Sequence, residues 1–373
     1  MVTTSFLPKR ITACLCRSFD GLRTQEAPGL CMPCVCCRKW VWIAVAFVLF
    51  GSSVSPAWAA YSGPRLKFRL AHPCPPGHHT TQAFEKFRDL VAEKSGGAIR
   101  VQLFPNAILG SDRVMLESAQ HGQLEMAVCS SPNMTHFSPQ YMVFDLPYIT
   151  RPDRQTQLYA AIERGELGRF FKQVANEIGL EPIMYAEYGY RHFVTVKTPV
   201  HAAGDLAGLK VRTTDSPVEA EVARALGMQP VPVVWGETYT ALEQGTVDAE
   251  GNTFSFLVDA QHYNVVKYAV LSEHNFCMQI LSANKEWWDA LDPQVRQVVT
   301  EAAAEALQYQ RKVLAPVAEE KARREFEAAG VVVQDLSPAS LEDFRRLTRP
   351  VWDMFSDRLS KELVHLITST QQD

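Results

Sequence analysis

The stretch from Gly208 to Asn252 constrains the fold more than any other part of the chain, because it alternates element types within 45 residues. Apolar spacing and the turn residues between the apolar runs predict a strand, a helix, an extended segment, a second helix and a turn. The strand is predicted at Leu209–Val211, the first helix at Val218–Met228, the extended segment at Pro230–Val234 and the second helix at Thr238–Gln244. Strands that alternate with helices in this way are typical of α/β folds.

Arg212 lies where the first of these strands gives way to a helix. In open α/β sheets this is the side on which ligands bind. A guanidinium there offers a planar pair of donors to a carboxylate and stays charged at any working pH. The position alone leaves a second interpretation open, in which Arg212 forms an ion pair with a neighbouring Asp or Glu.

The rest of the chain continues the alternation. Residues 66–129 predict the order β-α-β-α-β, and therefore a mostly parallel sheet covered by helices. Residues 293–328 predict a long helical segment that is kinked at Pro316 and could bridge two lobes. Further strands are predicted at Pro182–Tyr188, His192–Val196, Ala269–Leu271 and Phe276–Ala283.

Residues 1–59 carry the features of a secretory signal peptide. Arg38 and Lys39 precede an apolar run at 40–50 that is too short to span a bilayer, and an Ala-x-Ala site ends at Ala59. We therefore expect cleavage after Ala59 and export to the periplasm. Because the leader is unusually long, Met32 is an alternative start of translation.

Cleavage at this site leaves 314 of the 373 residues, with 31 basic and 39 acidic side chains. This length suffices for two lobes, and an acidic chain without a basic run argues against nucleic acid as a partner. Of nine cysteines, Cys74, Cys129 and Cys277 remain. Three scattered cysteines favour buried, small hydrophobic roles over a redox centre.

No G-x-S-x-G elbow, P-loop or H-E-x-x-H motif occurs in the sequence. His72, Cys74, His78 and His79 lie close together, but their spacing matches no standard zinc pattern, and a rigid proline-rich turn explains the segment more simply. We expect neither a metal nor a cofactor. An exported, two-lobed α/β chain without a catalytic constellation favours a binding protein over an enzyme.

Several segments together resemble the extracytoplasmic solute-binding proteins of tripartite ATP-independent periplasmic (TRAP) transporters, of the dicarboxylate-binding type. The most specific signal combines GLK-x-R with E-x-YTALEQG-x-VD, and the likeness covers essentially the whole mature chain. The segments are FEKFRDLVAEKSGGAIRVQLFPNAILGSDRVMLESAQHGQLEMAV, VFDLPYI, GYRHFVTVKTPV, DLAGLKVRTTDSP, ALGMQPVPVVWGETYTALEQGTVDAEGN and SANKEWWDALDPQVRQVV.

The resemblance implies a two-lobed periplasmic binding protein fold of the α/β class, with crossing hinge strands and a long hinge helix. Lobe I would comprise residues 60–188, completed by about 277–316, and lobe II residues 189–276, completed by about 317–373. The implied function is to bind an organic acid anion between the lobes and deliver it to the membrane subunits of a TRAP permease, driven by an ion gradient. We expect a monomer.

The resemblance also implies the core of the ligand site. Arg212 matches the arginine that binds the ligand carboxylate in a bidentate manner, and Arg191 matches a second arginine. Asn252 matches an asparagine that follows a turn, and Trp235 matches an aromatic residue ahead of the E-x-Y helix. Two interpretations without ligand contact stay open: core packing for Trp235 and a turn-forming role for Asn252.

His72 and Ser130 match ligand-contacting positions of the first lobe, although His72 could equally be a loop residue. The family pattern D-G-x-E-N-P is altered here at Ala249–Thr253, so we expect a different backbone path. Nearby aromatic residues suggest a larger or less charged acid. Two rival functions remain, an exported enzyme that acts on small carboxylic acids through His72 or Ser130, and a metal-binding receptor that uses the histidines of residues 72–79.

Overall fold

The computed structural model describes residues 61–372, which lie in one compact unit. The predicted signal peptide, the cleavage after Ala59 and the alternative start at Met32 fall outside these residues. Within the described range, no helix is both long enough and apolar enough to cross a membrane.

The described strands form one mixed sheet in the order β2-β1-β3-β8-β4-β7-β5-β6, with β9 paired to β8. β1 pairs in parallel with β2 and β3, as the alternation predicts. The strands are β1 (Leu66–Ala71), β2 (Ile99–Phe104), β3 (Met126–Ser130), β4 (Leu180–Thr195), β5 (Lys210–Thr213), β6 (Gln229–Pro232), β7 (Ala249–Asn252), β8 (Tyr268–Asn284) and β9 (Val332–Asp335).

Two long antiparallel strands, β4 and β8, join two halves of the sheet. The half with β1, β2 and β3 is called lobe I, and the half with β5, β6, β7 and β9 is called lobe II. The prediction of two separate strands in place of each long one is wrong. Register shifts at Glu187/Gly189 and Arg191/Phe193 let the strands bend without ending, and Gly189 has a φ of 119°. The predicted residue limits of the lobes stay predictions.

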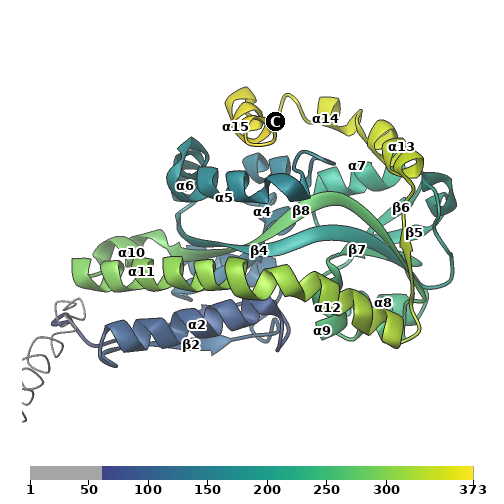
Figure 1. Ribbon diagram of the computed structural model, residues 1–373. Coiled ribbons are helices and arrows are strands. Elements are labelled where there is room, and N and C mark those ends of the chain that lie inside the picture. Colours follow the sequence, from purple (N-terminus) through teal and green to yellow (C-terminus); the bar gives the residue numbers. More distant parts are fainter. Residues whose placement is uncertain (1–60, 373) are drawn as a thin grey trace, which may run out of the picture. The chain divides into compact units, whose positions relative to one another are not determined.

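Helices cover both faces of the sheet (Figure 1). In lobe I, α2 and α11 pack on one face and α3, α5 and α6 on the other, while α8, α9 and α12 enclose a core in lobe II. The helices are α2 (His79–Lys94), α3 (Asp112–Gln120), α4 (Ser131–Met134), α5 (Gln155–Arg164), α6 (Glu166–Glu177), α7 (Pro217–Ala225), α8 (Trp235–Glu243), α9 (Phe254–Asp259), α10 (Lys285–Ala290), α11 (Pro293–Tyr309), α12 (Ala315–Ala328), α13 (Pro338–Thr348), α14 (Val351–Met354) and α15 (Lys361–Ser369).

The long helical segment is broken where proline predicts a kink. A π-helical turn at Gln310–Leu314 separates α11 from α12, and Pro316 lies in the first turn of α12. Gln310 is fully buried, accepts a hydrogen bond from the Glu187 amide at 3.0 Å and donates one to the Glu187 carbonyl at 2.9 Å. These two hydrogen bonds therefore hold the break in the helix against the bend in β4.

The stretch around Arg212 folds largely as its sequence predicts. Ser216 caps α7 by accepting a hydrogen bond from the Glu219 amide at 3.4 Å, and Pro217 begins the helix. The turn predicted around Asn252 is wrong, because residues 249–252 form β7. This segment pairs with β4 on one side and β5 on the other, so it gains ladder partners that a turn would lack.

Candidate functional site

One small cavity lies where the two lobes meet, and five of the six predicted site residues line it. These residues are Ser130, Arg191, Arg212, Trp235 and Asn252. The cavity holds only about 20 Å³, which is room for a single water. Any organic acid is larger, so a ligand requires the lobes or the lining side chains to move apart.

Arg212 presents an unpaired guanidinium to this cavity. The side chain is 4% exposed, its Nε donates to the Val233 carbonyl at 3.0 Å, and its guanidinium carbon lies 5.9 Å from the centre of the Trp235 ring. Within residues 61–372, no atom accepts a hydrogen bond from its two terminal nitrogens. Burial, together with the charge of Arg191, lowers the pKa of Arg212. An anion in the cavity would compensate this charge.

Arg191 is held differently, in a buried ion pair with Glu219. The Arg191 Nη1 and Glu219 Oε1 atoms lie 3.1 Å apart, and the two side chains are 3% and 8% exposed. Burial acts to lower the pKa of Arg191, but the charge of Glu219 and its other neighbours outweighs it and raises the pKa. Arg191 Nη2 also donates to the Gly251 carbonyl. The ion pair that we considered for Arg212 therefore forms at Arg191.

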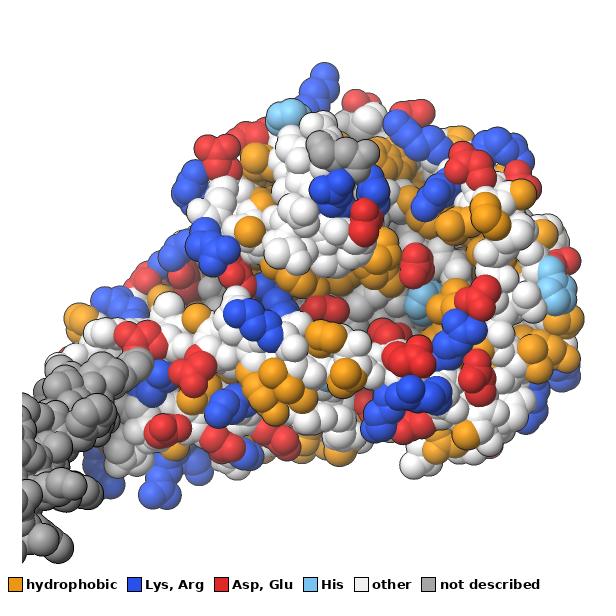
Figure 2. All heavy atoms as spheres, in the orientation of Figure 1, with side chains coloured by type: hydrophobic (Ala, Val, Ile, Leu, Met, Phe, Trp, Pro, Cys, Tyr) orange, Lys and Arg blue, Asp and Glu red, His pale blue; other side chains and the backbone are white. Residues whose placement is uncertain are grey.

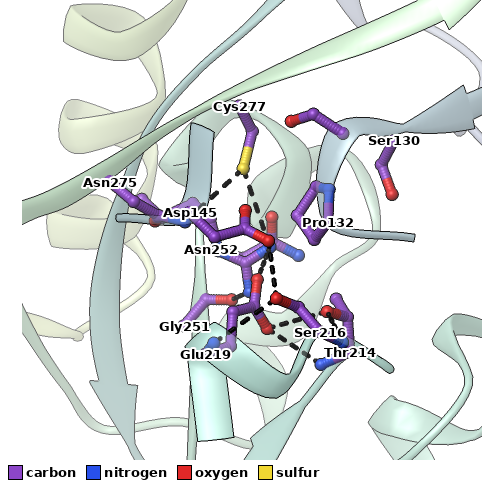
Figure 3. A network of polar contacts seen from close by, with 12 residues as sticks. Ser130, Pro132, Asp145, Thr214, Ser216, Glu219, Gly251, Asn252, Asn275 and Cys277 are labelled. Atoms are coloured by element: carbon purple, nitrogen blue, oxygen red, sulfur yellow. Dashed lines mark hydrogen bonds and ion pairs between the residues drawn. The ribbon is translucent and has the colours of Figure 1, made fainter. Parts of the chain in front are cut away.

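Glu219 belongs to a polar network that includes the cavity-lining residues Arg191 and Thr214 (Figure 3). Its Oε2 accepts hydrogen bonds from the amide and hydroxyl of Thr214, both at 2.9 Å, while Ser216 donates to Asp145 Oδ2 at 2.6 Å. Burial, and then the charge of Glu219, raise the pKa of Asp145 well above its usual value. The network thus fixes the position of Arg191.

Sequence reasoning missed Glu219 and Asp145. The spacing of Ser216 and Glu219 is that of a helix-capping box, which accounts for a glutamate at this position without any ion pair. Asp145 gave one usable signal, because it is the only acid inside the apolar segment VFDLPYI. A lone carboxylate in such a segment must find a buried partner.

Asn252 and Trp235 complete the lobe II wall. Asn252 Oδ1 accepts hydrogen bonds from the Tyr188 hydroxyl at 2.9 Å and the Thr253 amide at 3.0 Å, which leaves its Nδ2 as a donor. The half-buried Trp235 stacks on His262 with ring centres 4.9 Å apart and meets Phe256 edge-on at 4.5 Å. Both residues combine a packing role with a place in the cavity wall.

The lobe I wall is polar. Ser130 donates to Asp112 Oδ2 through its hydroxyl at 2.8 Å and through its amide at 3.0 Å. Asn133 Nδ2 donates to the same oxygen at 3.0 Å. Gln279 also lines the cavity, is 1% exposed, and its amide oxygen has no hydrogen-bond partner.

His72 does not line the cavity, although its neighbour Pro73 does. Its ring packs 5.0 Å from the Phe84 ring, both ring nitrogens lack hydrogen-bond partners, and burial lowers its pKa to about 4. The side chain thus occupies the lobe I core, where a neutral imidazole fits. Ligand contact by His72 stays a prediction.

The other candidate groups have structural partners. Cys74, Cys129 and Cys277 are free and buried, which confirms their predicted burial, and burial raises the pKa of each thiol. His78 hydrogen-bonds to Ser255 at 3.3 Å, and His79 to Gln310 at 3.1 Å. In the described part of the chain, no three His, Cys, Asp or Glu side chains converge as a metal site.

A larger groove of about 760 Å³ lies in lobe I between α6 and α11, where the surface in Figure 2 is hollowed. Its charged residues already have partners. Lys172 Nζ lies 2.6 Å from Glu181 Oε1, and Glu163 pairs with Arg311. Neither Arg191 nor Arg212 lines this groove. The groove therefore lacks the unpaired guanidinium that the smaller cavity has in Arg212.

Comparison with known proteins gives one consistent answer. Residues 70–358 match the model of the family described as bacterial extracellular solute-binding protein, family 7. The 2,3-diketo-L-gulonate-binding periplasmic protein YiaO of Escherichia coli is 30% identical over 285 residues, which cover 75% of this chain and 85% of that protein.

Two solved structures share the fold. A TRAP periplasmic solute-binding protein from Ochrobactrum anthropi is 33% identical, with a TM-score of 0.72 over 83% of this chain and 95% of that chain. The sugar acid-binding protein DctPAm from Advenella mimigardefordensis, in complex with galactonate, is 26% identical, with a TM-score of 0.78 over 83% of this chain and 98% of that chain. The two-lobed α/β fold agrees with these neighbours.

Proposed function

The chain belongs to the bacterial extracellular solute-binding proteins of family 7, a periplasmic family, and we propose that it captures an organic acid anion in the Arg212 cavity and delivers it to the membrane subunits of a TRAP transporter. The observation that carries this proposal is the buried guanidinium of Arg212, whose terminal nitrogens lack acceptors within residues 61–372. A carboxylate between the lobes would supply two parallel, charge-assisted hydrogen bonds. Acids are also named for YiaO and for the Advenella protein.

Lobe closure would couple binding to delivery. Arg212, Trp235 and Asn252 belong to lobe II, Ser130 belongs to lobe I, and Arg191 lies on the crossing strand β4. A ligand that contacts both walls stabilises the closed state by its differential affinity for that state. The closed surface is then the feature that a membrane partner recognises.

Replacing Arg212 by Lys tests the role of the guanidinium. A lysine keeps the charge but cannot make the bidentate contact, so we expect a loss of affinity of roughly 10- to 100-fold, measured by calorimetry with a carboxylate found in a thermal-shift screen. The matched control is Arg169→Lys, because Arg169 is 69% exposed in its ion pair with Glu166. Wild-type affinity in the Arg212→Lys variant would contradict the proposal.

We further propose that export removes residues 1–59 and that the bound acid is released unchanged. The family and the solved neighbours are binding proteins, which supports the second point. Prolonged incubation of protein with its ligand, followed by NMR of the supernatant, checks it. A new compound whose formation requires Ser130 would favour an enzyme instead.

A further inference from the structure

We propose that the ligand is a hydroxylated monocarboxylate, whose carboxylate binds lobe II and whose hydroxyl groups are recognised by lobe I. This inference rests on the proposed function and specifies the chemical class of the acid. It follows from how unsatisfied hydrogen-bond donors and acceptors are distributed around the cavity.

The lobe II wall offers donors. Within residues 61–372, the terminal nitrogens of Arg212 and the Nδ2 of Asn252 donate to no acceptor, whereas the remaining polar atoms of both side chains are engaged. Arg191 adds a buried Nε without a hydrogen-bond partner. Oxygen atoms that only accept hydrogen bonds suit this wall, and a carboxylate is such a group.

The lobe I wall offers a carboxylate of its own. Asp112, at the start of α3, lines the same cavity and is 5% exposed. Its three hydrogen bonds all come from neutral groups of Ser130 and Asn133, and all end on Oδ2. In Figure 3, Ser130 lies on the opposite side of the labelled group from Thr214 of lobe II. This end of the cavity therefore carries a negative charge and needs donors from the ligand.

Gln279 identifies the hydroxyl as the group that fits best. Its buried amide oxygen has no hydrogen-bond partner among the described residues, so, like Asp112, it calls for a donor from the ligand. Each hydroxyl donates one O–H, so two hydroxyl groups of one ligand can donate to Asp112 and to Gln279 Oε1. A second carboxylate would only accept, and would place its charge beside Asp112.

The balance of charge in the cavity agrees with a monoanion. On the lobe II wall, Glu219 compensates Arg191 in the buried ion pair, and Arg212 is left without an ion-pair partner within residues 61–372, while Asp112 keeps the lobe I end of the cavity negative. One ligand carboxylate can pair with Arg212 and lie away from Asp112. A dianion would bring a second charge for which the cavity wall provides no further arginine or lysine.

Two matched series of acids test the inference by calorimetry on the mature wild-type protein. The six-carbon series is gluconate, glucarate and hexanoate, and the four-carbon series is erythronate, meso-tartrate and butyrate. Within each series the second acid replaces the terminal CH₂OH of the first by a carboxylate, and the third lacks hydroxyl groups. In at least one series we expect the hydroxylated monoacid to bind roughly 100-fold more tightly than both analogues.

Equal or tighter binding of the diacid or of the unsubstituted acid in both series would overturn the inference. So would an absence of binding by all six acids. A thermal-shift screen of other carboxylates then separates the two proposals: a hit that depends on Arg212 leaves the proposed function standing, whereas no hit removes both.

Replacing Asp112 by Asn tests the residue that sets the preference. The amide keeps an oxygen acceptor for Ser130 and removes the charge, so we expect the affinity ratio of monoacid to diacid to fall roughly tenfold or more. The control is Asp357→Asn, which removes the same charge at an exposed position. An unchanged ratio in a folded Asp112→Asn protein refutes the assignment, and if that variant does not fold, the two acid series on wild-type protein decide alone.

Discussion

Replacing Glu219 by Gln should destabilise the folded protein by about 3–5 kcal/mol, because it leaves the buried Arg191 charge without its partner. The geometry is that of a buried ion pair, for which the loss of stability is larger than for an exposed pair: the two charged atoms are 3.1 Å apart, and the side chains are 3% and 8% exposed. Glutamine is nearly isosteric and keeps a carbonyl oxygen for the two hydrogen bonds from Thr214. The variant therefore isolates the charge.

Thermal unfolding monitored by circular dichroism measures this effect. At about 2 °C per kcal/mol for a chain of this size, the loss corresponds to a midpoint lower by roughly 6–10 °C. Glu221→Gln is the matched control on the same helix, because Glu221 pairs with Arg224 in an exposed setting, where such pairs contribute about 0–1 kcal/mol.

Asp145 gives the experiment a second arm. Its pKa is raised by burial and then by the charge of Glu219, so removal of that charge lowers the pKa of Asp145 and lets a fraction of Asp145 ionise and offset part of the loss at Arg191. The double variant Glu219→Gln/Asp145→Asn should therefore lose more stability than the two single losses combined. Equal midpoints for Glu219→Gln and Glu221→Gln, together with additivity in the double variant, would refute the reasoning.

Trp235 lines the cavity, so its fluorescence should report ligand binding. A carboxylate that changes the fluorescence of the wild-type protein should cause little change in the fluorescence of the Trp235→Phe variant, and an undiminished change would contradict the place of Trp235 in the cavity wall. Burial raises the pKa of Glu319 to about 7, so the folded state holds its proton longer than the unfolded state and stability falls as pH rises from about 4.5 to 7. Glu319→Gln should abolish this pH-dependent contribution to folding stability, which is at most about 1.4 kcal/mol per pH unit. An identical pH dependence of the melting midpoint in the wild-type protein and the variant would contradict it. Edman sequencing of the exported protein should begin at Ala60, and any other first residue would displace the proposed cleavage site.

Much of the fold follows from local patterns. The alternation of apolar runs with Gly, Pro and Ser punctuation predicts the α/β class, and the Ser216-Pro217 pair correctly begins α7. Pro316 predicts the break in the long helix. These features depend on backbone chemistry within a few residues, which a sequence displays directly.

The strands at the hinge were less predictable. Gly189 and the residues near His192 suggest strand ends, yet β4 and β8 continue through bulges. Similarly, residues 249–252 contain Gly and Asn, which favour a turn, but pair on both sides as β7. In each case, hydrogen bonds to strands far along the chain outweigh the local preference.

The sequence by itself determined the α/β lobes, the place of Arg212 at a strand end and the resemblance to acid-binding receptors. Only the tertiary structure decided which arginine is compensated, because Arg191 pairs with Glu219 only when the crossing strand β4 lies next to α7. The same holds for Asp145, whose bond to Ser216 spans 71 residues, and for Asp112, which the packing of lobe I brings to the cavity. Charge compensation in a buried site is a property of distances, and distances between remote residues are fixed only when the chain is folded.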